Sequence, residues 1–99
     1  MEFEGFDWDA GNREKCCKHG VSVREIEEVL RADPIFSPDH VHSSPAEQRF
    51  IAVGRTLAGR AMFVAFTLRL KDGRQLARPV SARYMHKKEA ERYARQTSN

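Results

Sequence analysis

The sequence predicts a small α+β fold in a single domain spanning residues 1–99. Before residue 37 apolar residues recur at helical spacing, and after residue 48 they recur at the spacing of strands until a last helical stretch near the C-terminus. A chain of 99 residues is one domain's worth of sequence. With 40% hydrophobic and 31% charged residues, its composition is that of a globular protein.

The first helix is expected to begin after Asp9, which can cap it, and to run through Lys18. Gly20 would end it by adopting a left-handed conformation. A final helix is expected from about residue 86 to residue 96, supported by oppositely charged side chains at four-residue spacing. Together with the helix between them, these segments supply the helical part of the fold.

The middle helix has the clearest local signature. Ser22 and Glu25 form the pattern of a capping box, and Val21 and Ile26 occupy the two positions of a hydrophobic staple. Pro34 is expected to stop the helix. The apolar residues of this segment fall on one face, so that face should pack on the sheet.

Three strands are expected, joined as an antiparallel meander by glycine-containing turns, at residues 49–54, 61–69 and 75–82. The residues between 37 and 48 are read as one long polar loop. The middle strand is apolar on both faces, so helices should cover at least one side of it. Pro79 cannot donate to a ladder and indicates an edge position or a bulge. Without a bulge, Arg78 and Arg83 would lie on opposite faces.

Charge is distributed unequally along the chain. Residues 1–48 carry five Lys or Arg against eleven Asp or Glu, a net charge of −6, whereas residues 49–99 carry twelve against three, a net charge of +9. A basic half of this kind is typical of a face that binds a polyanion, most often a nucleic acid. The alternative is that the two halves neutralise each other in three dimensions.

The sequence lacks the motifs of several common kinds of functional site. The sequence has no glycine-rich phosphate loop, no His-Glu-x-x-His, no Cys-x-x-Cys and no nucleophile elbow. We therefore expect no cofactor and no metal. His40 and His42 beside Asp39, completed by His19 or Cys16, would be a weak zinc pattern.

The two cysteines, the apolar runs and the N-terminal segment indicate the cellular compartment in which the protein is expected. Adjacent cysteines do not readily form a disulfide, so Cys16 and Cys17 are expected as thiols. Cys16 is either a nucleophile activated by nearby bases or a small buried apolar group. No apolar run is long enough to cross a membrane, and the acidic N-terminus does not look like a signal peptide. A cytoplasmic location is expected.

Three groups of residues, in this order and at these distances, resemble the BrnT-type toxins of type II toxin–antitoxin systems. They are Trp8-Asp9 with Asn12-Arg13-Glu14-Lys15-Cys16 and Lys18-His19-Gly20-Val21-Ser22; Glu47, Arg49 and Phe50 with Val53-Gly54-Arg55-Thr56; and Arg78-Pro79-Val80-Ser81-Ala82-Arg83-Tyr84-Met85 with Lys88, Glu89 and Tyr93. The resemblance implies a RelE-like α+β fold and a ribonuclease that inhibits translation. It also implies a BrnA-type antitoxin with a ribbon-helix-helix part, through which the complex would reach operator DNA.

The implied reaction is metal-independent cleavage of RNA, in which the ribose 2′-hydroxyl attacks the adjacent phosphate. Arginines suit the stabilisation of a phosphorane because they stay charged and bind two phosphate oxygens at once. The resemblance assigns this role to Arg83 and Arg49. His19 or Tyr84 would move a proton, His19 having the better natural pKa. The RNA backbone would be positioned by Lys18, Arg55, Arg78, Lys87 and Lys88.

Other interpretations stay open at this point. His19 precedes a helix-ending glycine, where an imidazole also interacts favourably with the helix C-terminus, and Arg49 can pair with Glu47. A non-catalytic module that binds the antitoxin and nucleic acid as a co-repressor would need the same basic face. The aromatic residues Phe3, Phe6 and Trp8 are either anchors for the antitoxin or part of the core.

Overall fold

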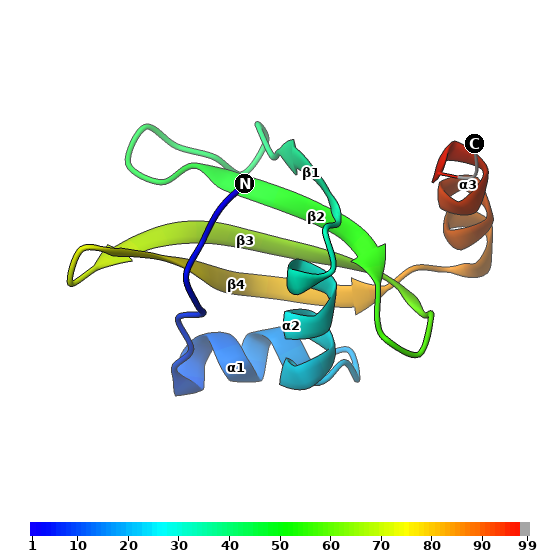
Figure 1. Cartoon of the computed structure of the whole chain (residues 1–99), viewed down its shortest axis with the longest axis horizontal. Helices are drawn as coiled ribbons and strands as arrows, with labels where there is room; N and C mark the ends of the chain where they lie inside the picture. Colours follow the sequence, from blue (N-terminus) through cyan, green and yellow to red (C-terminus); the bar gives the residue numbers. More distant parts are fainter. Residues whose placement is uncertain (98–99) are drawn as a thin grey trace.

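The computed structural model describes residues 1–97 and confirms the α+β prediction. Two N-terminal helices precede an antiparallel sheet, and a third helix follows it (Figure 1). No helix among the described residues is long and apolar enough to span a bilayer. The elements are α1 (Ala10–Cys17), α2 (Val23–Arg31), β1 (Ile35–Pro38), β2 (Arg49–Arg55), β3 (Ala61–Lys71), β4 (Arg74–Tyr84) and α3 (Lys87–Thr97).

The four strands lie in the order β1-β2-β3-β4, so the meander is confirmed, but the prediction of three strands is wrong. The missed strand, β1, pairs Ile35 with Val53 and Pro38 with Phe50. It is only four residues long and contains a proline, so it has too few residues to show a strand period. The polar loop therefore begins at Asp39 rather than at residue 37, and the other strands extend one or two residues beyond their predicted ends.

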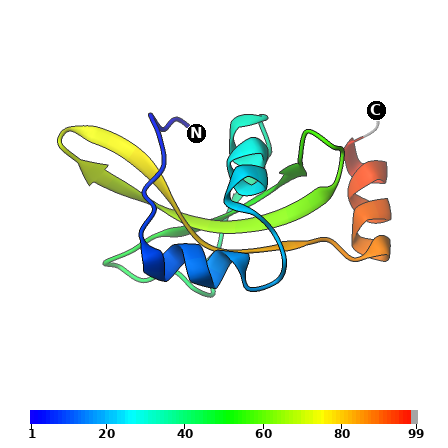
Figure 2. The same cartoon turned by 90° about the horizontal axis from the view of Figure 1, so that it is seen from below.

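The helix α2 covers one face of the sheet, as its apolar face predicts (Figure 2). Its buried residues Ile26, Val29 and Leu30 join a core with side chains of β2, β3 and β4. The capping box of Ser22 and Glu25 is present, with both reciprocal hydrogen bonds. The approach is close at Gly54 of β2, where a Cβ would lie 3.0 Å from the Cβ of Pro34 and 3.2 Å from Cγ1 of Val29.

The helix α1 runs along β4, on the other side of the sheet from α2 (Figure 2). Asp9 caps it as predicted, and Gly20 follows it with φ +86°. The buried Asn12 completes the cap and donates from Nδ2 to the carbonyl oxygens of Pro79 at 2.8 Å and Asp7 at 3.0 Å. One side chain thus closes the helix start and fastens it to the edge of the sheet.

Pro79 lies at a bulge in β4, which is also an edge strand, so both predicted settings apply. Phe66 pairs with Pro79 and Ala65 with Ser81, which leaves Val80 as the extra residue. The bulge resets the alternation, so Arg78 and Arg83 pair with Thr67 and Phe63, on the same face of β3.

The remaining parts lie around this frame. Helix α3 stands beyond the end of β4, away from the body of the sheet (Figure 1), and agrees with the prediction to within one residue at each end. Phe3, Phe6 and Trp8 are half-buried against the core, so they pack within this chain. Trp8 Nε1 also donates to Glu27 at 2.9 Å.

Candidate active site

A cleft of about 510 Å³ lies on the face of the sheet that α2 leaves open. In Figure 2, α1 and the loop between β1 and β2 both lie on this side of the sheet. The cleft is lined by Lys15 and His19 near the end of α1, Asp39 and His42 from the loop, Arg49 and Ile51 from β2, Phe63 and Ala65 from β3, and residues 80–83 of β4. Two arginines, one lysine and two histidines thus converge from four parts of the chain.

A second, larger groove of about 750 Å³ lies between the N-terminal segment, the end of α2 and the hairpin of β3 and β4. Its charged lining is Glu2, Glu4 and Asp33 against Arg31. An excess of carboxylates disfavours a polyanion. Of the two, the smaller cleft is therefore the candidate site for nucleic acid.

Arg83 reaches the cleft from the end of β4 and is held by α3. Its Nη1 and Nη2 donate to the two carboxylate oxygens of Glu89 at 2.9 and 3.0 Å. The guanidinium also lies 4.5 Å from the ring centre of Phe63 on the cleft floor. Hydrogen bonds from Arg83 lower the pKa of Glu89 to about 2, and the same contact raises the pKa of Arg83. The side chain of Arg83 is still 42% exposed, so a ligand can reach it.

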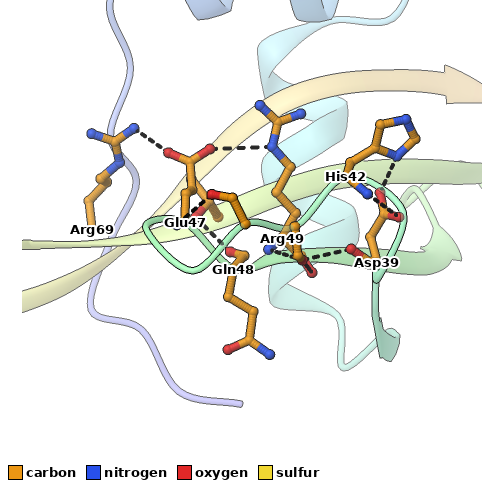
Figure 3. A network of polar contacts seen from close by, with 9 residues as sticks. Asp39, His42, Glu47, Gln48, Arg49 and Arg69 are labelled. Atoms are coloured by element: carbon orange, nitrogen blue, oxygen red, sulfur yellow. Dashed lines mark hydrogen bonds and ion pairs between the residues drawn. The ribbon is translucent and has the colours of Figure 1, made fainter.

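Arg49 begins β2 and is held in a similar way. Its Nε donates to Glu47 at 3.3 Å, and the other oxygen of Glu47 accepts from Arg69 at 2.9 Å (Figure 3). Figure 3 shows the side chains of Arg49 and His42 extending to the same side of the strand. The pairing anticipated between Arg49 and Glu47 is present, and it leaves both Nη groups of Arg49 without a hydrogen bond to Glu47.

Of the four residues assigned to catalysis by resemblance, the cleft brings together Arg83, Arg49 and His19 but not Tyr84. Tyr84 pairs with Met62 of the core and its hydroxyl donates to Glu25 of α2 at 2.7 Å. The hydrogen bond to Glu25 and burial raise the pKa of Tyr84. A tyrosine with a raised pKa is a poorer base, and this one is directed toward α2.

The five residues assigned to the RNA backbone divide into two groups. Lys18, Lys87 and Lys88 are exposed. Arg78 is instead paired with Asp7 at 3.5 Å and Asp9 at 2.9 Å.

Arg55 is similarly engaged, because it donates to the carbonyl of Gly59 and its guanidinium lies 5.2 Å from the ring centre of Tyr93. Several acids of the first half of the chain pair with bases of the second half, as Asp9 does with Arg78. The charge asymmetry is thus partly neutralised within the fold.

Two features of the cleft were not assigned from sequence. Lys15 lines it because α1 places that residue one turn before His19. Nδ1 of His42 lies at hydrogen-bond distance, 2.8 Å, from Oδ2 of Asp39. In the sequence these two residues were considered only as part of a possible metal site. The three-residue spacing of Asp and His, at which a carboxylate can accept from the later backbone N–H as in an N-cap, is the signal that was available. Among residues 1–97, no cluster of three or more His, Cys, Asp or Glu is arranged to hold a metal ion.

Burial decides whether Cys16 is a nucleophile or a buried apolar group. Cys16 is fully buried in the core, and burial together with the neighbouring Cys17 raises its pKa to about 11. Such a thiol is protonated at neutral pH and is a poor nucleophile. Cys16 is thus a small buried apolar group, the second of the two readings.

Comparison with known proteins finds a matching family. The model of a family described as the ribonuclease toxin BrnT of type II toxin–antitoxin systems matches residues 8–89. A search of curated proteins finds no significant match. The matched segment includes α1, α2, the whole sheet and Glu89, and therefore every residue that lines the cleft.

Proposed function

Because the chain belongs to the BrnT family of type II ribonuclease toxins, we propose that its open cleft cuts RNA by metal-independent attack of a ribose 2′-hydroxyl on the adjacent phosphate. The observation that carries the proposal is the convergence of Arg49, Arg83 and His19 on one cleft. The attack forms the O2′–P bond, breaks the P–O5′ bond and leaves a 2′,3′-cyclic phosphate. Dependence on the 2′-hydroxyl makes the reaction specific for RNA.

The two arginines stabilise the extra negative charge of the phosphorane. Each is fixed by a carboxylate, Arg83 by Glu89 and Arg49 by Glu47, so the guanidinium groups are oriented before substrate binds. Prearranged charge of this kind acts on the transition state with little reorganisation. A phosphate can engage the Nη groups of Arg49 directly, whereas at Arg83 it competes with Glu89.

His19 moves one of the two protons that the reaction requires. It is exposed, lines the same cleft as both arginines and carries an imidazole, the side chain that most often serves as a general acid or base. Lys15 and the exposed Lys18, Lys87 and Lys88 bind the flanking phosphates. Arg55 and Arg78, which are engaged within the fold, contribute less to RNA binding than the exposed lysines do.

A toxin of a type II system is neutralised by a protein antitoxin. We propose that this partner is a BrnA-type protein with a ribbon-helix-helix part, and that operator DNA is bound only through the complex. Free toxin would slow translation by cutting RNA. The family match supports a protein antitoxin in general.

The test is cleavage of end-labelled single-stranded RNA by purified protein in the presence of EDTA. We expect wild type to cut RNA and to leave a 2′-deoxy strand intact. Arg83→Ala should cut about a hundredfold or more slowly, because it loses a charge partner of the transition state. Arg74→Ala is the matched control, since Arg74 is an exposed arginine of the same strand that does not line the cleft.

Three results would contradict the proposal. Cleavage of the deoxy strand would exclude attack by the 2′-hydroxyl. If wild type cut RNA without EDTA but not in its presence, the metal-independent mechanism would be excluded. Folded wild type that binds RNA without cutting it, either free or on ribosomes, would instead favour the non-catalytic co-repressor.

A further inference from the structure

A second acid–base group lies in the cleft beside Arg49. The ring Nδ1 of His42 is 2.8 Å from Oδ2 of Asp39, and both residues line the cleft. The two partners differ in accessibility, because the side chain of Asp39 is 10% exposed and that of His42 is 65% exposed. A buried carboxylate behind an accessible imidazole is the arrangement by which proteins orient a histidine for proton transfer.

The charge state of Asp39 fixes the tautomer of the ring. Burial raises the pKa of the carboxyl, but hydrogen bonds from the ring and backbone of His42 outweigh that effect, and the pKa is lowered. Asp39 is therefore ionised near neutrality and can only accept hydrogen bonds. The proton of a neutral His42 then lies on Nδ1, and the lone pair lies on Nε2, the nitrogen that does not face Asp39.

The pair is attached to the backbone of Arg49. The N–H of Asp39 donates to the carbonyl of Arg49 at 2.8 Å, and the N–H of Arg49 donates to Oγ of Ser43 at 2.8 Å. Ser43 in turn donates to the carbonyl of Asp39 at 2.6 Å (Figure 3 shows this region). The loop that carries His42 is thus held in register with the strand that carries Arg49, as a site for oriented proton transfer needs.

The ring contact is not needed to form the turn. The backbone N–H of His42 already donates to Oδ1 of Asp39 at 3.3 Å, and the contacts of Ser43 close the loop independently. A residue at position 42 without a ring would keep those bonds. The fold of the loop therefore does not require the contact between the ring and Asp39.

We propose that His42 is the general base of RNA cleavage and that Asp39 is its positioning residue, an inference that rests on the proposed function. Nε2 of His42 takes the proton of the 2′-hydroxyl as the O2′–P bond forms. His19, in its protonated form, gives a proton to O5′ as the P–O5′ bond breaks. One proton enters the enzyme and one leaves, so the charge of the enzyme is unchanged. His42 ends protonated and His19 ends neutral.

The surroundings of His42 bear on its protonation. Lys15 of α1, His19 in the turn after it, Arg49 of β2 and Arg83 of β4 line the same cleft, and cations disfavour an imidazolium. Asp39 is the carboxylate in direct contact with the ring and favours it. Removal of that carboxylate should therefore shift the acidic limb of the rate profile to lower pH.

The experiment compares His42→Ala and His42→Gln with wild type on single-stranded RNA. We expect kcat to fall about a hundredfold or more in both, since general base catalysis is lost. His40→Ala is the matched control, because His40 is an exposed histidine of the same loop that does not line the cleft, and it should keep wild-type activity. Free imidazole should partly restore His42→Ala, and Asp39→Asn should show the shifted acidic limb.

A second substrate, with sulfur in place of the bridging O5′, separates the base from the acid. A thiolate leaves without a proton, so this substrate should restore cleavage by His19→Ala and not by His42→Ala. Restoration of His42→Ala by the thiolate substrate would overturn the assignment. Full activity of His42→Ala, with Arg83→Ala inactive, would overturn the roles assigned to His42 and Asp39 and leave the proposed function intact. Absence of cleavage by wild type, with both free RNA and RNA on ribosomes, would overturn both the assignment and the proposed function.

Discussion

Arg83 and Glu89 form a bidentate ion pair that joins the end of β4 to the first turn of α3. Glu89 Oε1 also accepts from the backbone N–H of His86 at 2.8 Å, so the same carboxylate caps the helix. Since α3 stands beyond the sheet, this pair and the contact of Arg55 with Tyr93 are attachments on which its position depends (Figure 1). The proposed catalytic arginine and the position of α3 are thereby coupled.

Glu89→Gln is expected to bind RNA about fivefold more tightly than wild type. The carboxylate occupies both Nη groups of Arg83, so a phosphate must compete with it. The variant removes the competing charge and keeps the size of the side chain. Binding to a 2′-deoxy strand, which is not cut, measures the change without interference from cleavage.

Glu91→Gln is the matched control for this change, because Glu91 is an exposed acid on the same helix and its loss alters the net charge equally. Equal tightening in both variants would show that only the net charge matters. Weaker binding by Glu89→Gln would mean that Glu89 chiefly orients Arg83.

The ion pair also predicts how stability changes with pH. The pKa of Glu89 is lowered from 4.5 to about 2 in the folded protein. A group whose pKa is lower in the folded state stabilises it above the unfolded pKa, and that contribution is lost as pH falls through the folded pKa. The difference in unfolding free energy between wild type and Glu89→Gln should therefore be largest above about pH 4.5 and shrink toward pH 2, as measured by urea unfolding. A difference that stays constant with pH would contradict this.

Local signals sufficed for much of the fold. The capping box of Ser22 and the cap at Asp9 depend on residues three positions apart, so sequence spacing reveals them. The strand β1 could not be found in this way, because its four residues are fixed by pairing with β2 across the loop. Long-range pairing of this kind leaves no periodic signal in a short segment.

The same distinction applies to the site. Arg49, Arg83 and His19 were assigned by resemblance, and the fold brings all three to one cleft. Tyr84 was assigned with them by the same resemblance, but it directly follows Arg83, and adjacent residues of a strand face opposite sides. The pairing of Asp39 with His42 was missed because its importance depends on Arg49, ten residues after Asp39, which holds the loop at the cleft.

Asn12→Ala is expected to destabilise the protein by about 2–4 kcal/mol, because it loses the reciprocal bond of the capping box, from the N–H of Asp9, and leaves two buried carbonyl groups without their donor. Ser22→Ala removes the N-cap side chain of α2 at an exposed position and should cost about 1 kcal/mol. Chemical unfolding of both variants at pH 7 measures the two values. Equal losses would mean that the bonds of Asn12 to Pro79 and Asp7 add little beyond the cap.

Cys17 should react with iodoacetamide in the native protein, while Cys16 should react only after unfolding. Cys16 is fully buried with a pKa raised to about 11, and alkylation requires an accessible thiolate. Cys17 is half-buried and so more accessible than its neighbour. Mass spectrometry of peptides after labelling with and without urea distinguishes the two sites. Rapid labelling of native Cys16 would contradict the packing of α1 on β4.

Tyr84→Phe is expected to keep kcat for RNA cleavage within about threefold of wild type, whereas loss of a general acid or base costs a hundredfold or more. The hydroxyl of Tyr84 bonds to Glu25 on the side of α2, and the ring lies 3.5 Å from the guanidinium of Arg60. The substitution should cost about 1 kcal/mol of stability, the worth of one hydrogen bond. Single-turnover cleavage and urea unfolding measure the two effects, with His40→Ala as an unaffected reference. A hundredfold loss of kcat in a stable Tyr84→Phe protein would return Tyr84 to the active site and require the end of β4 to rearrange when RNA binds.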